Sequence, residues 1–337
     1  MSKLTCVGGY RRYFVTLILA LFLLLVGIRL TEKSTKSAVE PTQTWERYTT
    51  AIIKDRPSTV LPSVSSPLAV VLPVSFDTVN ETFNCTTARV ADIQFPICIY
   101  ANDSDIYISG MLLRSAYFEL DEVSQLVSLL QRNPRLQFVD IGANIGLYTL
   151  PIARVTNVLA VEPNWRSMVR LSKAVDLGEV VSNVTLIHNA VSDVRATVNM
   201  GIDPTNQGHA FIINTTECKS TFEGDSCTTL KQITTVLLND LLPVMHLKAA
   251  VLKVDVESHE TSVFTEQSAG QFFDQIDVPV VFMEWKWCKL NSPKIVQRLL
   301  DFFQTRNYVA FDTDNVRLTS HYRNWPINVL FKKSNIN

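Results

Sequence analysis

The chain has 337 residues, of which 47% are hydrophobic and 19% charged, with only 11 Gly and six Cys. This composition excludes global disorder, collagen-like repeats, coiled coils and disulfide-dense miniproteins. The 31 basic and 32 acidic residues give a formal net charge of −1, which argues against a nucleic-acid binder that depends on a phosphate-neutralising surface.

The N-terminal region carries an apolar segment. Residues 13–28 read YFVTLILALFLLLVGI, with Arg11 and Arg12 before them and Arg29 after them. A helix needs about 17 to 25 residues to cross a bilayer core, so a segment extended to Leu30 just spans a thin membrane. We predict a cytosolic tail at 1–12 and an uncleaved signal-anchor at 13–30. A cleaved signal peptide is the alternative, although no small-x-small site directly follows the apolar run.

Glycosylation sequons indicate which side of the membrane the body occupies. Five of them follow the apolar segment, at Asn80, Asn84, Asn102, Asn183 and Asn214. One sequon is weak evidence, but five favour a lumenal body. The sequence therefore predicts a single-pass type II membrane glycoprotein of the endoplasmic reticulum or Golgi.

The cysteines agree with a lumenal body. Two close pairs, Cys85 with Cys98 and Cys218 with Cys227, are disulfide candidates in an oxidising compartment. Buried free thiols are the alternative for both pairs. Cys288 has no evident partner.

A spacer precedes the folded body. Residues 31–81 hold five of the 14 prolines, many Ser and Thr, and no Gly. Repeated proline favours extended chain, so we predict a stem at 31–81 and a lumenal catalytic domain at 82–337.

Within this domain, short apolar runs alternate with helical patterns. The predicted strands are 137–142, 157–163, 184–191, 250–257, 279–286, 308–312 and 327–333. Helices are predicted from Ile145 onward and at 165–176, 259–275 and 293–306, and a polar stretch at 196–235 can form a hairpin. This alternation indicates an α/β fold with a mainly parallel seven-stranded sheet, helices on both faces and the last two strands antiparallel. Ligands of such sheets bind at the carboxyl ends of the strands.

The first of these strands ends in a glycine turn, Asp140-Ile-Gly142-Ala-Asn144-Ile-Gly146. The glycines permit a tight turn with backbone close to a ligand, and Asp140 can take a cationic or amine group. A dinucleotide fingerprint would need Gly where Asn144 and Leu147 stand, so pyrophosphate binding is disfavoured.

An acid follows at the end of the second strand. Glu162 lies 20 residues beyond Gly142, where a carboxylate can accept both hydroxyls of a ribose. A glycine turn, a ribose acid and no phosphate cradle together suggest S-adenosylmethionine as the cofactor. A purely structural turn is the alternative for the glycines.

Six blocks in this order resemble the signature of FkbM-type methyltransferases: FVDIGANIGLYTL, VLAVEPN, LIHNAVSD, TTVLLNDLLP, VLKVDVESHE and VVFMEWK. The resemblance covers about residues 137–286. It implies a Rossmann-like, S-adenosylmethionine-dependent fold and methyl transfer to a hydroxyl oxygen. The cofactor positions that it implies are Asp140, Gly142, Asn144, Gly146 and Glu162, with Asn189 and Ala190 beside the adenine.

The chain departs from the family pattern twice. The usual acid-glycine pair after the fourth strand is here Glu257-Ser258, and the usual paired acids of the L-D-D-L block are Asn239-Asp240. Serine in place of glycine can narrow the backbone approach to substrate. An inert lumenal binding protein on the same fold is therefore an alternative.

Carboxylates near the expected methyl position are the catalytic candidates. Asp255 is the first candidate for the general base or for acceptor orientation, and Glu257 is the second. Behind them stand His209, Glu260 and Glu284. The structural alternative is that Asp255 and Glu257 bond loop amides and cap the helix that starts at His259.

A metal site is a weaker reading of the same acids. Asp255, Glu257, His259 and Glu260 include oxygen ligands that a divalent ion prefers. Strand and helix geometry would not direct all four inward, so the sequence predicts no metal. Trp285 and Trp287 could stack on a sugar, but we predict core packing.

A Golgi glycosyltransferase is the rival from another enzyme class. Asp312-Thr-Asp314 imitates a metal-nucleotide D-x-D motif, but Asp103-Ser-Asp105 has the same pattern. The sequence thus predicts a lumenal S-adenosylmethionine-dependent O-methyltransferase that acts on a glycan or small-molecule acceptor and binds no nucleic acid. It names neither the acceptor nor an oligomeric state.

Overall fold

The computed structural model describes residues 71–72, 82–115, 120–203, 206–213, 228–229 and 232–334. The predicted anchor, most of the stem and the Cys218–Cys227 pair lie outside these residues. In the part that is described, no helix is both long enough and apolar enough to cross a membrane.

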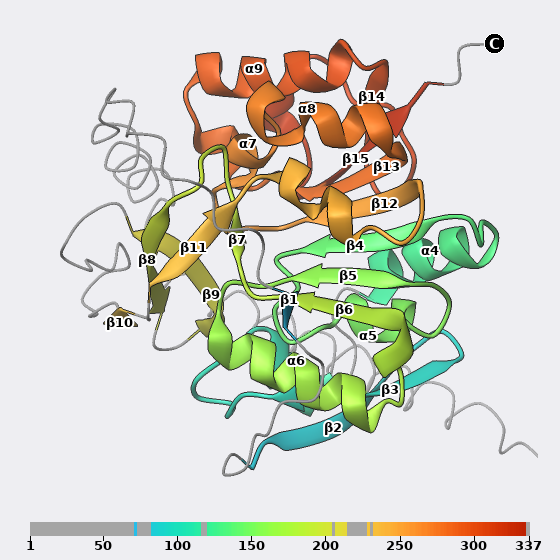
Figure 1. Cartoon of the computed structure of the whole chain (residues 1–337), viewed down its shortest axis with the longest axis vertical. Coiled ribbons are helices and arrows are strands. Elements are labelled where there is room, and N and C mark those ends of the chain that lie inside the picture. The colour runs from blue at the N-terminus through green and yellow to red at the C-terminus, as the bar shows by residue number, and fades with distance from the viewer. Residues whose placement is uncertain are drawn as a thin grey trace, which may run out of the picture. The chain divides into compact units, whose positions relative to one another are not determined.

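The main sheet has eight strands in the order β1-β6-β5-β4-β12-β13-β15-β14 (Figure 1). The seven predicted strands are all present, as β4 (Gln137–Ile141), β5 (Val158–Val161), β6 (Val184–Ile187), β12 (Ala249–Val254), β13 (Asp277–Glu284), β14 (Tyr308–Phe311) and β15 (Asn328–Lys333). As predicted, β4, β5, β6, β12 and β13 run parallel, and β15 pairs antiparallel with β14. The eighth strand, β1 (Val71–Leu72), pairs antiparallel with β6 at the edge, so residues within the predicted stem region join the sheet.

Helices cover both faces of this sheet, as expected for buried parallel strands (Figure 1). One core contains side chains of α4 (Leu120–Gln131), α5 (Thr149–Ile152), α6 (Trp165–Leu177) and the hairpin of β2 (Asn84–Val90) and β3 (Ile93–Ile99). The other contains side chains of α7 (Glu260–Val263), α8 (Glu266–Gln275) and α9 (Pro293–Gln304). Successive residues of β4 alternate between the two, because Phe138 joins the first core and Val139 the second. The other helical segments among the described residues are α3 (Ile108–Ser115), η2 (Val181–Asn183), η3 (Leu238–Val244), η4 (Cys288–Leu290) and η5 (Tyr322–Asn324).

Two predicted helices were wrong in their bounds. α5 begins at Thr149 rather than Ile145, because Asn144 (φ 49°) and Gly146 (φ 94°) are left-handed and cannot join a right-handed helix. The helix predicted at 259–275 is interrupted between α7 and α8. There Thr265 is extended, and its hydroxyl accepts a hydrogen bond from the Ser268 amide, which starts a new helix.

A smaller sheet lies beside the carboxyl ends of β4, β5 and β6 (Figure 1). It contains β7 (Ala190–Val191), β8 (Thr197–Asp203), β9 (Asn206–Ile213), β10 (Thr228–Thr229) and β11 (Ile233–Val236). The antiparallel β8–β9 pair is the hairpin predicted within 196–235. The run predicted as one strand at 184–191 is divided, since β6 stays in the main sheet and β7 pairs with β11 in the small one.

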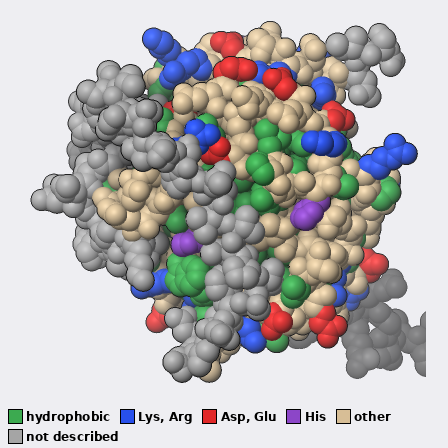
Figure 2. All heavy atoms as spheres, in the orientation of Figure 1, with side chains coloured by type: hydrophobic (Ala, Val, Ile, Leu, Met, Phe, Trp, Pro, Cys, Tyr) green, Lys and Arg blue, Asp and Glu red, His purple; other side chains and the backbone are tan. Residues whose placement is uncertain are grey.

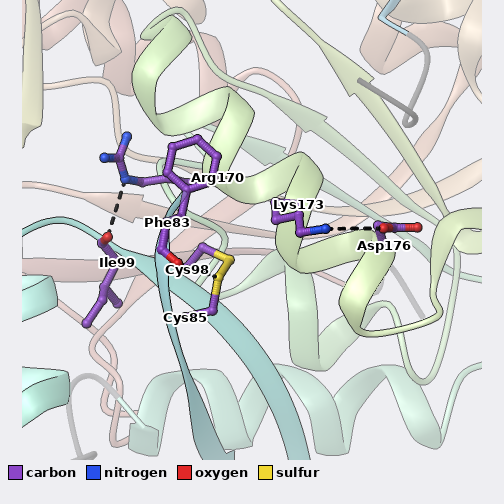
Figure 3. The surroundings of a disulfide bond; sticks show 7 residues. All are labelled: Phe83, Cys85, Cys98, Ile99, Arg170, Lys173 and Asp176. Carbon is purple, nitrogen blue, oxygen red and sulfur yellow. Dashed lines mark hydrogen bonds and ion pairs between the residues drawn. A yellow bond between two sulfur atoms is a disulfide. The ribbon is translucent and has the colours of Figure 1, made fainter. Parts of the chain in front are cut away.

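The disulfide predicted between Cys85 and Cys98 is formed, and it joins β2 to β3 (Figure 3). Arg170 of α6 holds this hairpin against the body, since its guanidinium lies 4.7 Å from the centre of the Phe83 ring and its Nε donates to the Ile99 carbonyl. Cys288 is buried and free, as its lack of a sequence partner predicted.

Candidate functional site

A cavity lies at the carboxyl ends of β4, β5 and β12, between the main sheet and the β8–β9 hairpin. It measures about 830 Å³, counted out to its open mouth. Most of the residues predicted from the sequence meet in its walls: Gly142, Asn144, Glu162, Asn189, Ala190, Asp255 and Glu257. The other two predicted cofactor residues, Asp140 and Gly146, are not part of the lining.

The two glycines of the turn have packing reasons of their own. Gly142 has φ +83°, and a Cβ there would lie 1.7 Å from the Asp255 carbonyl oxygen. Gly146 has φ +94°, and a Cβ there would lie 2.4 Å from Cδ1 of Leu171 on α6. Both glycines thus let the turn pack against the end of β12 and against α6. The sequence analysis instead attributed them to a close approach between the backbone and a ligand.

Asp140 binds a cation, but the cation belongs to the protein. Its carboxylate is fully buried, accepts a hydrogen bond from the Thr149 hydroxyl (2.6 Å) and lies 3.6 Å from the ammonium of Lys253. The same ammonium donates to the Gly142 carbonyl (2.9 Å) and lies 3.4 Å from the Asp255 carboxylate. Lys253 therefore ties the glycine turn to the end of β12. Sequence reasoning missed it, although a lysine inside the apolar run AVLKV was the available signal.

Glu162 is held in one orientation at the end of β5. Its Oε2 accepts the Asn144 amide (2.8 Å), and its Oε1 accepts the Asn164 amide (2.7 Å). Burial raises its pKa to about 7, against the opposing effect of these two hydrogen bonds. Each carboxylate oxygen keeps a further lone pair, so a ligand diol in the cavity has an acceptor for both hydroxyls.

The small sheet supplies the adjoining wall. Asn189 precedes β7, and its side-chain amide donates to the Thr234 carbonyl (3.1 Å), which fixes this corner of the cavity. Ala190 and Val191 follow it in the lining, together with Met200 and Ile212 of the hairpin. The side chains of Ala190, Val191, Met200 and Ile212 make this wall apolar, as an aromatic base requires.

The opposite end of the cavity is acidic. One carboxylate oxygen from each of Asp255, Glu257 and Glu284 lies within 4.8 Å of the other two. His209 of β9 approaches Glu257 with 3.0 Å between Nε2 and Oε2, and the Trp287 indole donates to the same oxygen (3.1 Å). The predicted catalytic pair therefore does lie together, with His209 and Glu284 beside it.

Charge and desolvation shift the pKa values at this end. The Asp255 side chain is 35% exposed, and desolvation by the cavity walls raises its pKa against the effect of Lys253. Burial also raises the pKa of Glu284 well above its usual value. For Glu257, burial is outweighed by the charge and hydrogen bond of His209, so its pKa is lowered. Glu257 in turn raises the pKa of His209, although burial opposes this.

Glu260 performs the structural role that was the alternative for Asp255 and Glu257. Its Oε1 accepts the amides of Val256 and Ser258 (both 3.2 Å), and burial raises its pKa to about 8. His259, the residue before α7, makes no side-chain cap and instead approaches the Ser192 hydroxyl (2.9 Å).

The first departure from the family pattern has a backbone explanation. Glu257 (φ 50°) and Ser258 (φ 78°) are both left-handed, a region where glycine is free of strain and other residues are not. A glycine at 258 would therefore adopt the same turn, and serine adopts it at a cost in strain. The serine is therefore compatible with the turn that a glycine would make here.

The second departure is also structural. Asn239 donates to the Gln267 carbonyl (2.9 Å) and accepts the Phe272 amide (2.8 Å), and an aspartate could not make the first bond. Asp240 binds Arg195 through both carboxylate oxygens (2.8 and 2.6 Å). Neither residue lines the cavity.

The remaining candidate motifs lie away from the cavity walls. Asp105 accepts bonds from Ser109 at the start of α3, and Asp312 accepts the Val316 amide in a turn. Neither D-x-D pattern lines the cavity. Trp285 and Trp287 are buried, which confirms the predicted core packing.

The surface carries both signs of charge. On the face shown in Figure 2, acidic and basic side chains are both present among the described residues, with apolar and uncharged surface between them. This distribution agrees with the near-neutral net charge of the whole chain.

Comparison with known sequences gives one family. A model described as "Methyltransferase FkbM domain" matches residues 140–310, from the last buried acid of β4 to β14. No curated protein matches the chain.

Solved structures resemble the chain weakly. A methyltransferase FkbM from Methylobacillus flagellatus KT is 14% identical over 58% of this chain, with a TM-score of 0.37, and this chain spans 43% of it. A rRNA methylase from Streptococcus thermophilus is 12% identical over 63% of this chain and 95% of its own, with a TM-score of 0.34. An O-methyltransferase described as SAM-dependent, from Thermotoga maritima, is 9% identical over 74% of this chain and 77% of its own, with a TM-score of 0.32.

Proposed function

Because this chain belongs to the FkbM methyltransferase family, we propose that it transfers a methyl group from S-adenosylmethionine to a hydroxyl oxygen of its acceptor. The observation that carries the cofactor assignment is Glu162, a buried carboxylate that lines the cavity at the end of β5 and has lone pairs left for a diol. It lies next to the glycine turn and away from any phosphate-binding pattern.

The residues present fit such a cofactor at one end of the cavity. Glu162 would accept the ribose hydroxyls, the backbone at Gly142 and Asn144 would flank the sugar, and Asn189 with Ala190 would border the base. The bound cofactor would supply an electrophilic methyl group. The protein then has to hold the acceptor oxygen in line and remove its proton.

Asp255 is suited to the second task. Lys253 fixes its carboxylate at the end of β12, and its raised pKa brings it closer to the range where a carboxylate accepts a proton from an acceptor hydroxyl near neutral pH. Glu257 is ionised more readily and is held by His209 and Trp287, so we assign it to orienting the acceptor.

The two alternatives fare differently. A glycosyltransferase would need a metal-nucleotide motif at the site, and both D-x-D patterns lie outside the cavity lining. The reason to consider an inert binding protein was Ser258, and this serine adopts the left-handed turn that a glycine would adopt. Turnover decides between an inert protein and an enzyme.

We further propose that the body faces the lumen of the secretory pathway, anchored by residues 13–30. The disulfide between Cys85 and Cys98 supports an oxidising compartment. Of the described sequons, Asn84 and Asn102 are exposed, whereas the Asn183 side-chain amide donates to the Ala153 carbonyl and is less available. A lumenal glycan is then the acceptor class to test first, and the mixed surface charge gives no support to nucleic acid.

The test is transfer of label. Full-length chain is incubated with S-adenosylmethionine labelled in the methyl group and with glycans of the secretory pathway, and the labelled product is identified. We expect an O-methylated sugar. A chain that binds the cofactor but labels no hydroxyl acceptor would support the inert alternative and contradict this proposal.

A further inference from the structure

Beside the acidic end of the cavity lies an acid that the proposed reaction leaves unexplained. Glu284 ends β13, and Asp255 directly follows the neighbouring parallel strand β12. Because carboxyl ends of adjacent parallel strands meet at one edge, the two carboxylates converge there. Glu257 completes the group, with one oxygen of each residue within 4.8 Å of the others.

Glu284 provides a second observation that points to a ligand beside these three carboxylates. Its Oε2 is shielded from solvent and has no hydrogen-bond partner among the described residues, and its carboxyl group is directed at Asp255 and Glu257. A buried acceptor without a donor is costly, and a second and third carboxylate beside it add repulsion. Asp255 and Glu257 each pair with a basic side chain, whereas no hydrogen bond reaches the Glu284 Oε2 within the described chain.

The nearby basic groups are already used. Lys253 is shared among Asp140, Asp255 and the Gly142 carbonyl. His209 pairs with Glu257, and the ammonium of Lys286 lies 4.5 Å from the centre of the Trp287 ring. Glu260 adds a fourth buried acid whose Oε2 also has no partner. Acidic groups therefore outnumber basic ones at this end.

We propose that Asp255, Glu257 and Glu284 bind a hard divalent cation. Calcium and magnesium prefer carboxylate oxygens at about 2.0 to 2.6 Å, so two oxygens on one ion lie at most about 5 Å apart. The observed spacing within 4.8 Å meets this limit. A cation there supplies the partner that the Glu284 Oε2 lacks among the described residues.

These three ligands differ from the set of four residues, Asp255, Glu257, His259 and Glu260, that the sequence analysis rejected as a metal site. That set included His259 and Glu260, and the structure commits these to Ser192 and to two loop amides. Glu284 replaces them, because β13 brings it beside Asp255 from 29 residues further along the chain.

On the basis of the proposed function, the cation also narrows the acceptor. Three protein oxygens leave several of the six to eight coordination positions for other oxygens. Asp255 and Glu257 line the cavity, so those positions are accessible to the acceptor. A hydroxyl on the cation loses its proton more easily, and a neighbouring oxygen on the acceptor would bind beside it, as in a sugar diol.

The experiment measures metal binding without methyl transfer. Purified full-length chain, stripped with a chelator and then desalted, is titrated with Mn²⁺ while the electron paramagnetic resonance signal of the free ion is followed. Ca²⁺ and Mg²⁺ are then used to compete. We expect one Mn²⁺ per chain, displaced by either competitor, and at least tenfold weaker binding in Glu284→Gln. The matched control Glu266→Gln changes a carboxylate that is 74% exposed on α8 and should bind as the wild type does.

Thermal unfolding of the same samples guards against a folding defect. Mn²⁺ should raise the melting temperature of the wild type and of Glu266→Gln, but not that of a folded Glu284→Gln. The proposal is overturned if the folded wild type binds no Mn²⁺ at millimolar concentration, or if Glu284→Gln binds it equally well. An adventitious surface ion would show as binding that Glu284→Gln leaves intact. A chain that binds Mn²⁺ and transfers no methyl group would refute the proposed function alone.

Discussion

The two ends of the cavity differ in how completely their polar groups are satisfied. At the β5 end, both oxygens of Glu162 accept backbone amides and Asn189 is bonded to Thr234. At the β12–β13 end, three carboxylates converge, and the Oε2 of one of them, Glu284, accepts no hydrogen bond within the described chain. The hydrogen bonds of the first end are thus made within the protein, whereas the second end leaves a shielded carboxylate oxygen for the cation that we propose.

The residues of one end could be predicted from the sequence more completely than those of the other. The residues of the β5 end, Glu162, Asn189 and Ala190, were all predicted from the sequence, and all three line the cavity. The acidic end holds the Ser258 departure and an acid from another strand, so its chemistry depends on geometry. Four changes in the protein test this division.

The largest effect is expected at the junction between the two ends. Gly142→Ala would place a methyl group 1.7 Å from the Asp255 carbonyl at a φ of +83°. We expect a loss of roughly 3 kcal/mol or more in the free energy of unfolding, measured by urea denaturation. Gly110→Ala on α3 is the control, because its new methyl group meets chiefly a movable Asn102 side chain. Equal stability of both variants would mean that the close contact between Gly142 and the Asp255 carbonyl does not matter for folding.

Asp255→Asn should separate the two ends by function. Removing the proposed base should lower the rate of methyl transfer by about 10²- to 10⁴-fold, while cofactor affinity changes little. Transfer of labelled methyl and calorimetric titration of cofactor measure the two quantities. Asp176→Asn, on an exposed part of α6, serves as the control. A parallel loss of cofactor affinity and rate would refute the separation.

Buried acids should make the folded state less stable as pH rises. The pKa of Glu260 is about 8 in the folded protein against 4.5 for a free group. Between these values the folded state holds a proton that the unfolded state has released. Stability from this group is therefore full below pH 4.5 and declines as pH rises towards 8.

Glu260→Gln should remove that decline. Its oxygen can keep the amides of Val256 and Ser258, and its NH₂ replaces the oxygen that has no partner. In chelator, urea unfolding should show similar stability of variant and wild type near pH 5 and a variant more stable by a few kcal/mol at pH 8. Glu266→Gln should follow the wild type. An unchanged difference across this range would contradict the assignment.

The smallest effect is expected at Ser258. Serine is left-handed there (φ 78°), so Ser258→Gly should relieve strain and stabilise the chain by about 1 kcal/mol. Urea unfolding measures this gain, and methyl transfer should be retained. A destabilised or inactive glycine variant would show that the serine hydroxyl, rather than the turn, matters.

Much of this fold could be predicted from the sequence. The seven strands of the main sheet that were predicted carry continuous apolar runs, and burial on both faces of the sheet requires such runs. The helix bounds at Ile145 and after Phe264 could not be read in the same way. Apolar spacing continues through both points, and only the left-handed Asn144 and the Thr265 cap interrupt the helix.

The site was predicted unevenly for a similar reason. Glu162 follows the glycine turn at a fixed spacing, so one segment of sequence contains its signal. Glu284 reaches Asp255 only because β13 pairs with β12. Asp140 does not line the cavity, and its carboxylate instead pairs with the ammonium of Lys253. Contacts between distant segments decide where the Glu284 and Asp140 side chains lie, and a pattern along one segment of the sequence does not show those contacts.

Cofactor binding at Glu162 is the most direct test of the account. Calorimetric titration of full-length chain with S-adenosylmethionine should show one site per chain. Glu162→Ala, shown by thermal unfolding to be folded, should bind at least about 100-fold more weakly, because a charged acceptor for two hydroxyls is lost. Glu266→Ala should bind as the wild type does. A folded wild-type chain that binds no S-adenosylmethionine, or a Glu162→Ala variant that binds it normally, would contradict the central claim.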